Sequence, residues 1–312
     1  MRRRFFTLFA TACLCLMTYG SALAAPSVSV WVALSETGGA HAEAAEALRT
    51  EVEKALPGRI DWRVAHWSQF SGATPEPHWI VAVGTAAQRG MQGLFAADTT
   101  PPPLLAILVP RLAFERIADQ RRLRAASVSA VFLDQPPARQ LELIHLALPA
   151  ARNVGILVSA ESQAHGAGLE KAAKDRGMRL AVSPVGQDGL FPALQSLLAD
   201  AEVLLALPDP AVFNGQTAAN ILTAAYRRHV PLVGFSPAYV KAGALLALYS
   251  TPAQVGARGG EVLRQTLPGK LLPPPQWPRE YVVAVNQDVA RSLGIALDEK
   301  VLAEQLRQKE RP

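Results

Sequence analysis

The middle of the chain contains a strand–helix–strand unit that decides the fold. Residues 154–185 are VGILVSAESQAHGAGLEKAAKDRGMRLAVSPV. The short apolar run 154–158 predicts a buried strand, 163–176 predicts a helix, and 179–185 predicts a second strand. A helix between two strands is the crossover that parallel strands require. The unit therefore indicates an α/β fold with parallel sheets.

The same alternation of strands and helices extends in both directions. One series covers 28–109, a second covers 129–249, and a helix at 251–267 and a lone strand at 281–285 follow. Even without its first 24 residues, the 312-residue chain reaches the length at which a single core stops growing. We therefore predict two Rossmann-like lobes joined by several crossings. Lobe one comprises 25–131 and 249–276, and lobe two comprises 132–248 and 277–312.

The first 24 residues have the three parts of a secretory signal peptide. Arginines occupy positions 2–4, residues 5–19 are almost entirely apolar, and 22–24 are Ala-Leu-Ala. Signal peptidase requires small residues at the first and third positions before its cut. We therefore expect cleavage near Ala24 and a periplasmic mature protein. The alternative is a retained anchor, although the apolar run is shorter than the roughly 20 residues that span a bilayer.

The cysteines and the net charge also belong largely to this leader. Cys13 and Cys15 are the two cysteines of the chain, so the mature protein has no thiol and no disulfide. Acylation of Cys13, as in a lipoprotein, is a second alternative, but the run before it lacks the usual leading Leu. Removing the three leader arginines lowers the formal charge from +5 to +2. This balance gives no indication of nucleic-acid binding.

The chain lacks the short motifs that mark common catalytic and metal sites. It has no G-x-S-x-G, no P-loop, no H-E-x-x-H and no G-x-G-x-x-G after a strand. None of the six histidines has metal-ligand spacing to another histidine or to a carboxylate pair. We therefore expect no catalysis, no metal and no cofactor. An exported hydrolase is the alternative from another functional class.

Polar and small residues recur instead in the loops that follow the predicted strands. In parallel sheets these loops meet at the carboxyl ends of the strands, where ligands bind. Asp209 in Leu-Pro-Asp-Pro would place a carboxylate at a cleft, or would cap the next turn. The helix that begins after Gly84 would present backbone N–H groups to an anion. The candidate ligand-binding residues are Ser35, Gly84, Thr85, Arg111, Ser159, Asp209, Asn214, Ser236 and Tyr239.

From Asp134 onward the chain resembles the ABC-transporter substrate-binding family that includes tryptophan- and tyrosine-linked uptake systems. The resemblance implies a type I periplasmic binding protein with a three-strand hinge and no catalysis. We expect a monomer that delivers a small molecule, such as an amino acid or an aromatic acid, to an ABC permease. The alternative partner is a sensor or an outer-membrane uptake system. The matching runs are 139–149, 154–157, 206–210, 231–237, 240–244, 256–261, 285–286 and 290–294.

Two loops depart from the family pattern. Family members usually carry Asp-Pro after the third strand of lobe one, where this chain has Val-Pro-Arg at 109–111. Arg111 would suit a carboxylate bidentately if it faces the cleft, and is otherwise a surface residue. The loop 159–162 is also unusual. For a zwitterionic ligand we expect helix N-termini to bind the carboxylate and Asp209 to bind the amine. Stacking walls would come from Phe213, Phe235, Tyr239 or Tyr249.

Overall fold

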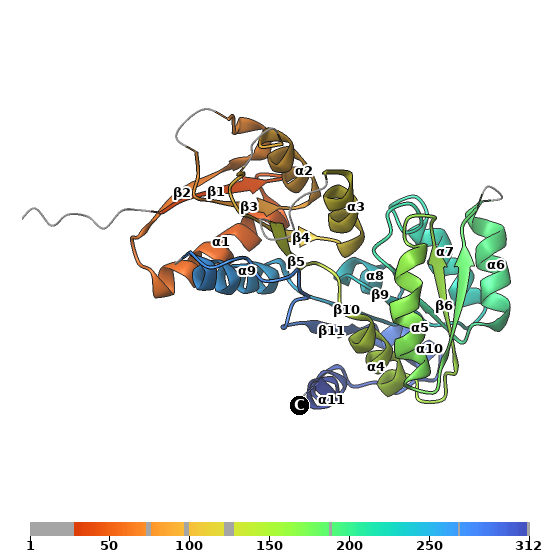
Figure 1. Cartoon of the computed structure of the whole chain (residues 1–312). Coiled ribbons are helices and arrows are strands. Elements are labelled where there is room, and N and C mark those ends of the chain that lie inside the picture. Colours follow the sequence, from red (N-terminus) through yellow and green to blue (C-terminus); the bar gives the residue numbers. More distant parts are fainter. Residues whose placement is uncertain are drawn as a thin grey trace, which may run out of the picture.

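The computed structural model describes residues 28–72, 76–96, 100–121, 128–186, 189–267 and 269–310, and the predicted signal peptide lies outside these residues. The chain forms two α/β lobes, as predicted (Figure 1). In the part of the chain that the structure describes, no helix combines the length and the apolar character that crossing a membrane requires.

Lobe one is built on a five-stranded parallel sheet of order β2-β1-β3-β4-β5. The central strands are fully buried, since helices cover both faces of the sheet. The strands are β1 (Val28–Leu34), β2 (Ile60–His66), β3 (Trp79–Val83), β4 (Leu104–Val109) and β5 (Val128–Phe132). The helices are α1 (Gly39–Ala55), α2 (Thr85–Leu94), α3 (Arg111–Arg121) and α9 (Pro252–Thr266), with a 3₁₀ turn η1 (Trp67–Gln69).

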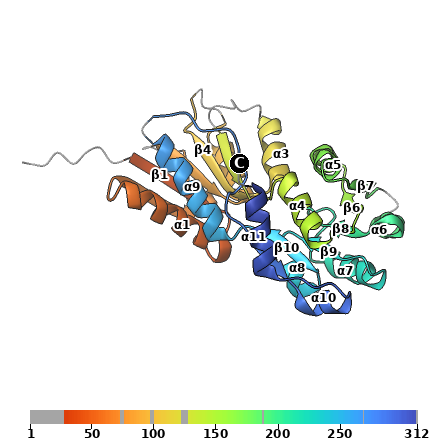
Figure 2. The same ribbon diagram turned by 90° about the horizontal axis from the view of Figure 1, so that it is seen from below.

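Helix α9 returns to lobe one from the far part of the chain and packs on α1 (Figure 2). It begins with a capping box in which the Thr251 side chain accepts from the Gln254 N–H, and Pro252 occupies its first turn. Glycines allow the close approach. A Cβ on Gly256 would lie 2.1 Å from the Ala44 carbonyl oxygen, and one on Gly260 would lie 2.7 Å from that of Leu48. Larger residues at these two positions would push the helices apart.

Lobe two is built on a six-stranded sheet of order β11-β10-β9-β8-β6-β7, in which β11 alone is antiparallel to its neighbour. Its strands are β6 (Asn153–Val158), β7 (Arg179–Pro184), β8 (Val203–Leu205), β9 (Leu232–Gly234), β10 (Leu246–Tyr249) and β11 (Val282–Val285). Its helices are α4 (Pro137–Ala147), α5 (Gly166–Lys174), α6 (Leu190–Asp200), α7 (Ala218–Arg227), α8 (Pro237–Ala242), α10 (Gln287–Ser292) and α11 (Glu299–Glu310), with a 3₁₀ turn η2 (Gln163–His165).

Three chain segments cross between the lobes: one after β5, one before α9, and one after the Pro-rich connector. In the connector, the Gln276 N–H donates to Ala130 O and its carbonyl accepts from the Phe132 N–H, which extends the edge of the lobe-one sheet. A buried polar cluster links the crossings. Gln135 Nε2 donates to Ser250 Oγ at 2.9 Å, and Ser250 Oγ donates to the Glu280 carbonyl. The cluster fixes the three crossings relative to one another.

Candidate functional site

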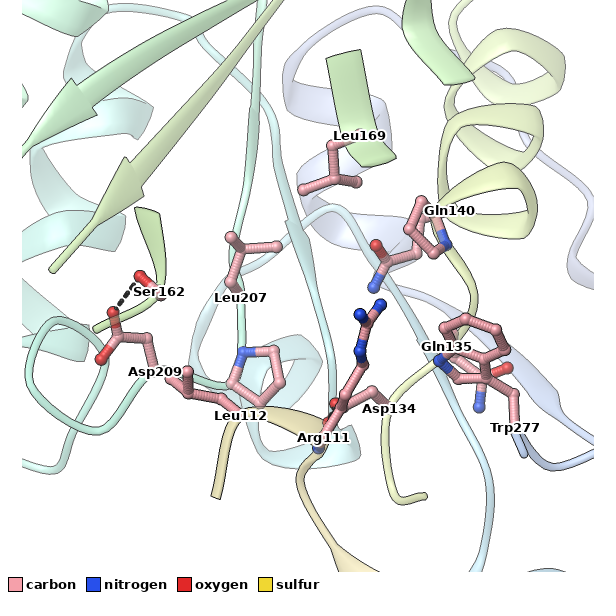
Figure 3. Close-up of a pocket in the computed structure, with 12 residues that line it drawn as sticks. Arg111, Leu112, Asp134, Gln135, Gln140, Ser162, Leu169, Leu207, Asp209 and Trp277 are labelled. Carbon is pink, nitrogen blue, oxygen red and sulfur yellow. Dashed lines mark hydrogen bonds between the residues drawn. The ribbon is translucent and has the colours of Figure 1, made fainter. Parts of the chain in front are cut away.

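A cavity opens between the two lobes beside the hinge (Figure 3). Its volume of about 60 Å³ holds a few water molecules, so a larger solute would extend from it into the cleft. Lobe one contributes Arg111 and Leu112 from α3. The crossings contribute Asp134, Gln135 and Trp277, and lobe two contributes Pro137, Gln140, Ser162, Leu169, Leu207, Pro208 and Asp209.

Arg111 is the first residue of α3 and projects into this cavity (Figure 3). The strand before it ends in a bulge between Ile107 and Val109, with Leu108 in the left-handed region at φ 54°. Arg111 Nε donates to Glu115 Oε1 at 2.5 Å, and the guanidinium carbon lies 5.5 Å from the centre of the Trp277 ring. These contacts hold the guanidinium by one edge and one face.

Asp134 lies next to Arg111, in the first crossing. Its Oδ2 accepts from the Arg111 backbone N–H at 2.6 Å, at the N-terminus of α3. Its Oδ1 is buried and has no hydrogen-bond partner among the described residues. Burial raises the pKa of this carboxyl to about 7, against the opposing effect of the Arg111 N–H and guanidinium. Asp134 is therefore a carboxyl group that titrates near neutral pH.

Asp209 lies on the lobe-two side of the cavity and is 2 % exposed. Its Oδ2 accepts from Ser162 Oγ at 2.5 Å and from the Ser159 N–H at 3.0 Å, and its Oδ1 accepts from the Ala211 N–H. Burial opposes ionisation, but these hydrogen bonds outweigh it and lower the pKa. The carboxylate therefore caps its own turn, as in the alternative interpretation, and also ties two loops of lobe two together.

Ser35, Gly84 and Thr85 come together at the carboxyl ends of β1 and β3. Ser35 Oγ accepts from the Ala87 N–H at 2.9 Å, in the first turn of α2. Gly84 precedes this helix with φ +89°, and a Cβ there would lie 2.5 Å from both Ser35 Oγ and His41 Nε2. The three candidates thus form one group in lobe one. They lie outside the residues that line the cavity.

Asn214, Ser236 and Tyr239 lie in lobe two, also outside the cavity lining. Asn214 Oδ1 accepts from the N–H groups of Gln216 and Thr217, before α7. Ser236 occupies the cap position of the short helix α8.

The ring of Tyr239 is 8 % exposed and lies 4.7 Å from that of Phe235 and 6.3 Å from that of Phe213. The rings of Phe213 and Tyr239 belong to the core of lobe two and that of Phe235 packs against it, and none of the four aromatic residues expected to form a stacking wall lines the cavity.

The cavity residues that reasoning from the sequence missed include Asp134, Gln135, Gln140 and Trp277. Gln140 lies in one of the runs that resemble the family, so a signal for it was present but was used only for the resemblance. Trp277 lies in a Pro-rich connector, where neither strand nor helix pattern gives a direction to its side chain. Its position depends on the return of the chain to the edge of lobe one.

Comparison with known proteins identifies the family. Residues 65–309 match the model of the ABC transporter substrate binding protein family. The chain belongs to this family. No curated protein sequence matches it.

Three solved structures share the fold of this substrate-binding protein. An ABC domain from Streptococcus pneumonia in complex with L-Trp has 17% identity and a TM-score of 0.60, and covers 89% of this chain and 98% of its own. A ligand-free, open substrate-binding protein with adhesive properties from Clostridium difficile has 18% identity, a TM-score of 0.64 and coverage of 88% and 96%. A conserved domain protein from Vibrio cholerae has 20% identity, a TM-score of 0.59 and coverage of 89% and 98%. The fold is that of type I periplasmic binding proteins, as the resemblance implied.

Proposed function

We propose that this substrate-binding protein captures a small solute between its lobes in the periplasm and delivers it to an ABC permease. The observation that carries the proposal is the cavity, because α3 of lobe one, the crossings and four segments of lobe two all line it. A solute bound there touches both lobes and therefore favours their closed arrangement. Binding without catalysis is what the family predicts.

The export part of the proposal rests on the first 24 residues. We expect the full-length chain, expressed in a Gram-negative host, to reach the periplasm and to begin at Ala25 after cleavage. Cell fractionation followed by N-terminal sequencing of the purified protein tests this. A cytoplasmic protein that retains its leader would contradict export and leave the binding proposal standing.

The capture part of the proposal is tested with the purified protein. Mass spectrometry of small molecules released on denaturation should identify a bound solute. Adding that compound back raises the free energy of unfolding by about 2.7 kcal/mol at a hundredfold excess over Kd. Small-angle X-ray scattering should then show a smaller radius of gyration. A protein that releases no solute, and whose melting temperature is unchanged by a broad metabolite library, would contradict capture.

The partner is tested separately. The permease proposal predicts that genes for a permease and an ATPase lie beside the gene for this protein. It also predicts that deleting the permease abolishes uptake of the released compound. Uptake that persists in the permease deletion would favour the sensor or outer-membrane alternative.

A further inference from the structure

Arg111 is the single cationic side chain among the residues that line the cavity. Its Nε is bonded to Glu115, but Nη1 and Nη2 have no partner among the described residues. The guanidinium carbon also lies over the Trp277 ring, 5.5 Å from its centre. The two free nitrogens therefore present a rigid pair of donors, spaced as the two oxygens of a carboxylate require.

Gln140 faces the same space from lobe two. Its residue is 7 % exposed, and its amide group has no hydrogen-bond partner among the described residues. In Figure 3 the guanidinium of Arg111 projects toward this amide. The amide atoms are not among the fully buried atoms that lack a partner, so they are open to the cavity, where Nε2 can donate to an oxygen atom of a solute. A carboxylate between the two side chains would accept from Arg111 on one side and from Gln140 Nε2 on the other.

The acidic groups of the cavity are poorly placed to bind an ammonium group. Asp209 accepts three hydrogen bonds from its own lobe, of about four that a carboxylate can accept, and is almost completely buried. Asp134 has one oxygen bonded to the Arg111 N–H and the other buried, and is partly protonated at neutral pH. An α-amino group would therefore find no free, exposed carboxylate in the cavity lining.

Two of the remaining lining residues are polar, and their side chains already have partners: Gln135 bonds to Ser250 and Arg139, and Ser162 bonds to Asp209. The rest of the lining is mostly apolar. It consists of leucine and proline side chains together with the Trp277 ring, namely Leu112, Pro137, Leu169, Leu207, Pro208 and Trp277. These groups gain free energy by contact with an apolar body, and the indole N–H of Trp277 is the one hydrogen-bond donor among their side chains.

We propose that the solute class is an apolar monocarboxylate without an α-amino group, whose carboxylate binds between Arg111 of lobe one and Gln140 of lobe two. This inference rests on the proposed function. Since the two side chains belong to different lobes, the carboxylate itself joins the lobes when they close. The amine contact expected of Asp209 is replaced by its contacts to Ser159, Ser162 and Ala211.

The test uses matched probes and titration calorimetry on the mature protein. Each set keeps one apolar body and varies the polar group: 3-phenylpropionate, 3-phenylpropionamide and L-phenylalanine, and the corresponding indole and isobutyl sets. For at least one of the three apolar groups we expect the acid to bind about 10- to 100-fold more tightly than its amide. This is the change in affinity that one hydrogen bond to a charged group contributes. The acid should also bind at least as tightly as the amino acid.

The outcomes separate this inference from the proposed function. An amide or amino acid that binds more tightly than its acid would overturn the carboxylate class and leave capture intact. If none of these probes binds, the solute released from the purified protein decides, because a compound without a carboxylate overturns the inference and an apolar acid supports it. A protein that releases nothing and binds nothing overturns both.

Two variants locate the contact. Arg111→Gln should weaken binding of the best acid probe about 10- to 100-fold, and Gln140→Glu should weaken it further by charge repulsion. Arg264→Gln is the matched control, since Arg264 is 38% exposed, as Arg111 is 36% exposed, and its Nε also pairs with a glutamate, Glu51. Arg264 lies on α9, outside the cavity lining. Equal affinities of the Arg111→Gln variant and the wild type, with both folded by circular dichroism, would refute the site.

Discussion

Two carboxyl groups line the same cavity: Asp209, in a loop of lobe two, and Asp134, in the hinge segment. Their pKa values are shifted in opposite directions. Asp209 accepts from three donors, and its pKa is lowered despite burial. Asp134 accepts from one donor, and its pKa is raised to about 7 because its other oxygen is buried without a partner. Burial is the largest cause of the raised pKa of Asp134, whereas at Asp209 the hydrogen bonds together outweigh the effect of burial and keep the carboxylate charged.

The difference follows from where the donors come from. All three donors to Asp209 belong to lobe two, so they stay in place when the lobes move. The donor to Asp134 is the Arg111 N–H of lobe one, while Asp134 itself lies in a crossing. We infer that Asp209 is a fixed structural element and that Asp134 responds to changes at the hinge.

The largest expected effect is the loss of stability in Asp209→Ala. The variant removes the carboxylate to which Ser162 Oγ and the N–H groups of Ser159 and Ala211 donate, and the Ser159 N–H keeps a second acceptor, Ser162 Oγ. It should lower the free energy of unfolding by about 3 kcal/mol. Urea denaturation measures the change. Asp200→Ala, at an exposed aspartate of the same lobe, serves as the control and should change stability by less than about 0.5 kcal/mol. If Asp209→Ala keeps the stability of the wild type but loses solute binding, Asp209 contacts the ligand and is not a structural element.

The next effect concerns pH and Asp134. In an unfolded chain an aspartate has a pKa of about 3.9, whereas burial raises that of Asp134 to about 7 in the folded protein. Between these two values the folded state binds more protons, so its stability decreases as pH rises from about 4 to about 7. The charged groups that face Asp134 are Arg111, which lowers its pKa, and Glu115, which raises it.

Asp134→Asn should remove this part of the pH dependence. An amide keeps an oxygen to accept from the Arg111 N–H but never ionises, so the variant should exceed the wild type in stability at pH 8 by about 2 kcal/mol. Chemical denaturation at pH 5 and pH 8 measures the difference. Asp61→Asn, at an exposed residue of lobe one, is the control. Parallel pH profiles of Asp134→Asn and the wild type would refute the raised pKa.

The fold was largely predictable because buried parallel strands have a strong apolar signal. The runs at β1, β3, β4 and β6 were all identified. Strand β2 was missed, since it lies at a sheet edge and most of its residues are exposed or half-buried, which leaves no continuous apolar run. Helix α7 begins only at Ala218, because Asn214 and Thr217 form a turn before it.

The cavity was less predictable because its residues come from distant parts of the chain. Of the residues to which the strand-end loops pointed, Arg111 and Asp209 line the cavity. The pattern could not show which oxygen atoms were already occupied, so it did not separate a ligand contact from a loop contact at Asp209. Gln140 lies inside helix α4, and a pattern of polar residues in strand-end loops gives no information on helix interiors.

The smallest expected effect tests Asn214, a second lobe-two residue whose polar atoms serve the lobe itself. Its Oδ1 accepts from two N–H groups and its Nδ2 donates to Pro210 O at 3.0 Å. Asn214→Ala should therefore cost about 1 kcal/mol of stability, the usual value of a helix-terminal side-chain cap, with solute affinity unchanged. Asn220→Ala is the matched control, because Asn220 is exposed within α7, where alanine is the better helix former, and should stabilise the protein by about 0.5 kcal/mol. If urea denaturation shows a lower free energy of unfolding for Asn214→Ala and a higher one for Asn220→Ala, then Asn214, like Asp209, belongs to the framework of lobe two. If Asn214→Ala instead keeps its stability and loses affinity, the solute reaches beyond the cavity to the start of α7, and the ligand must be larger than the cavity alone indicates.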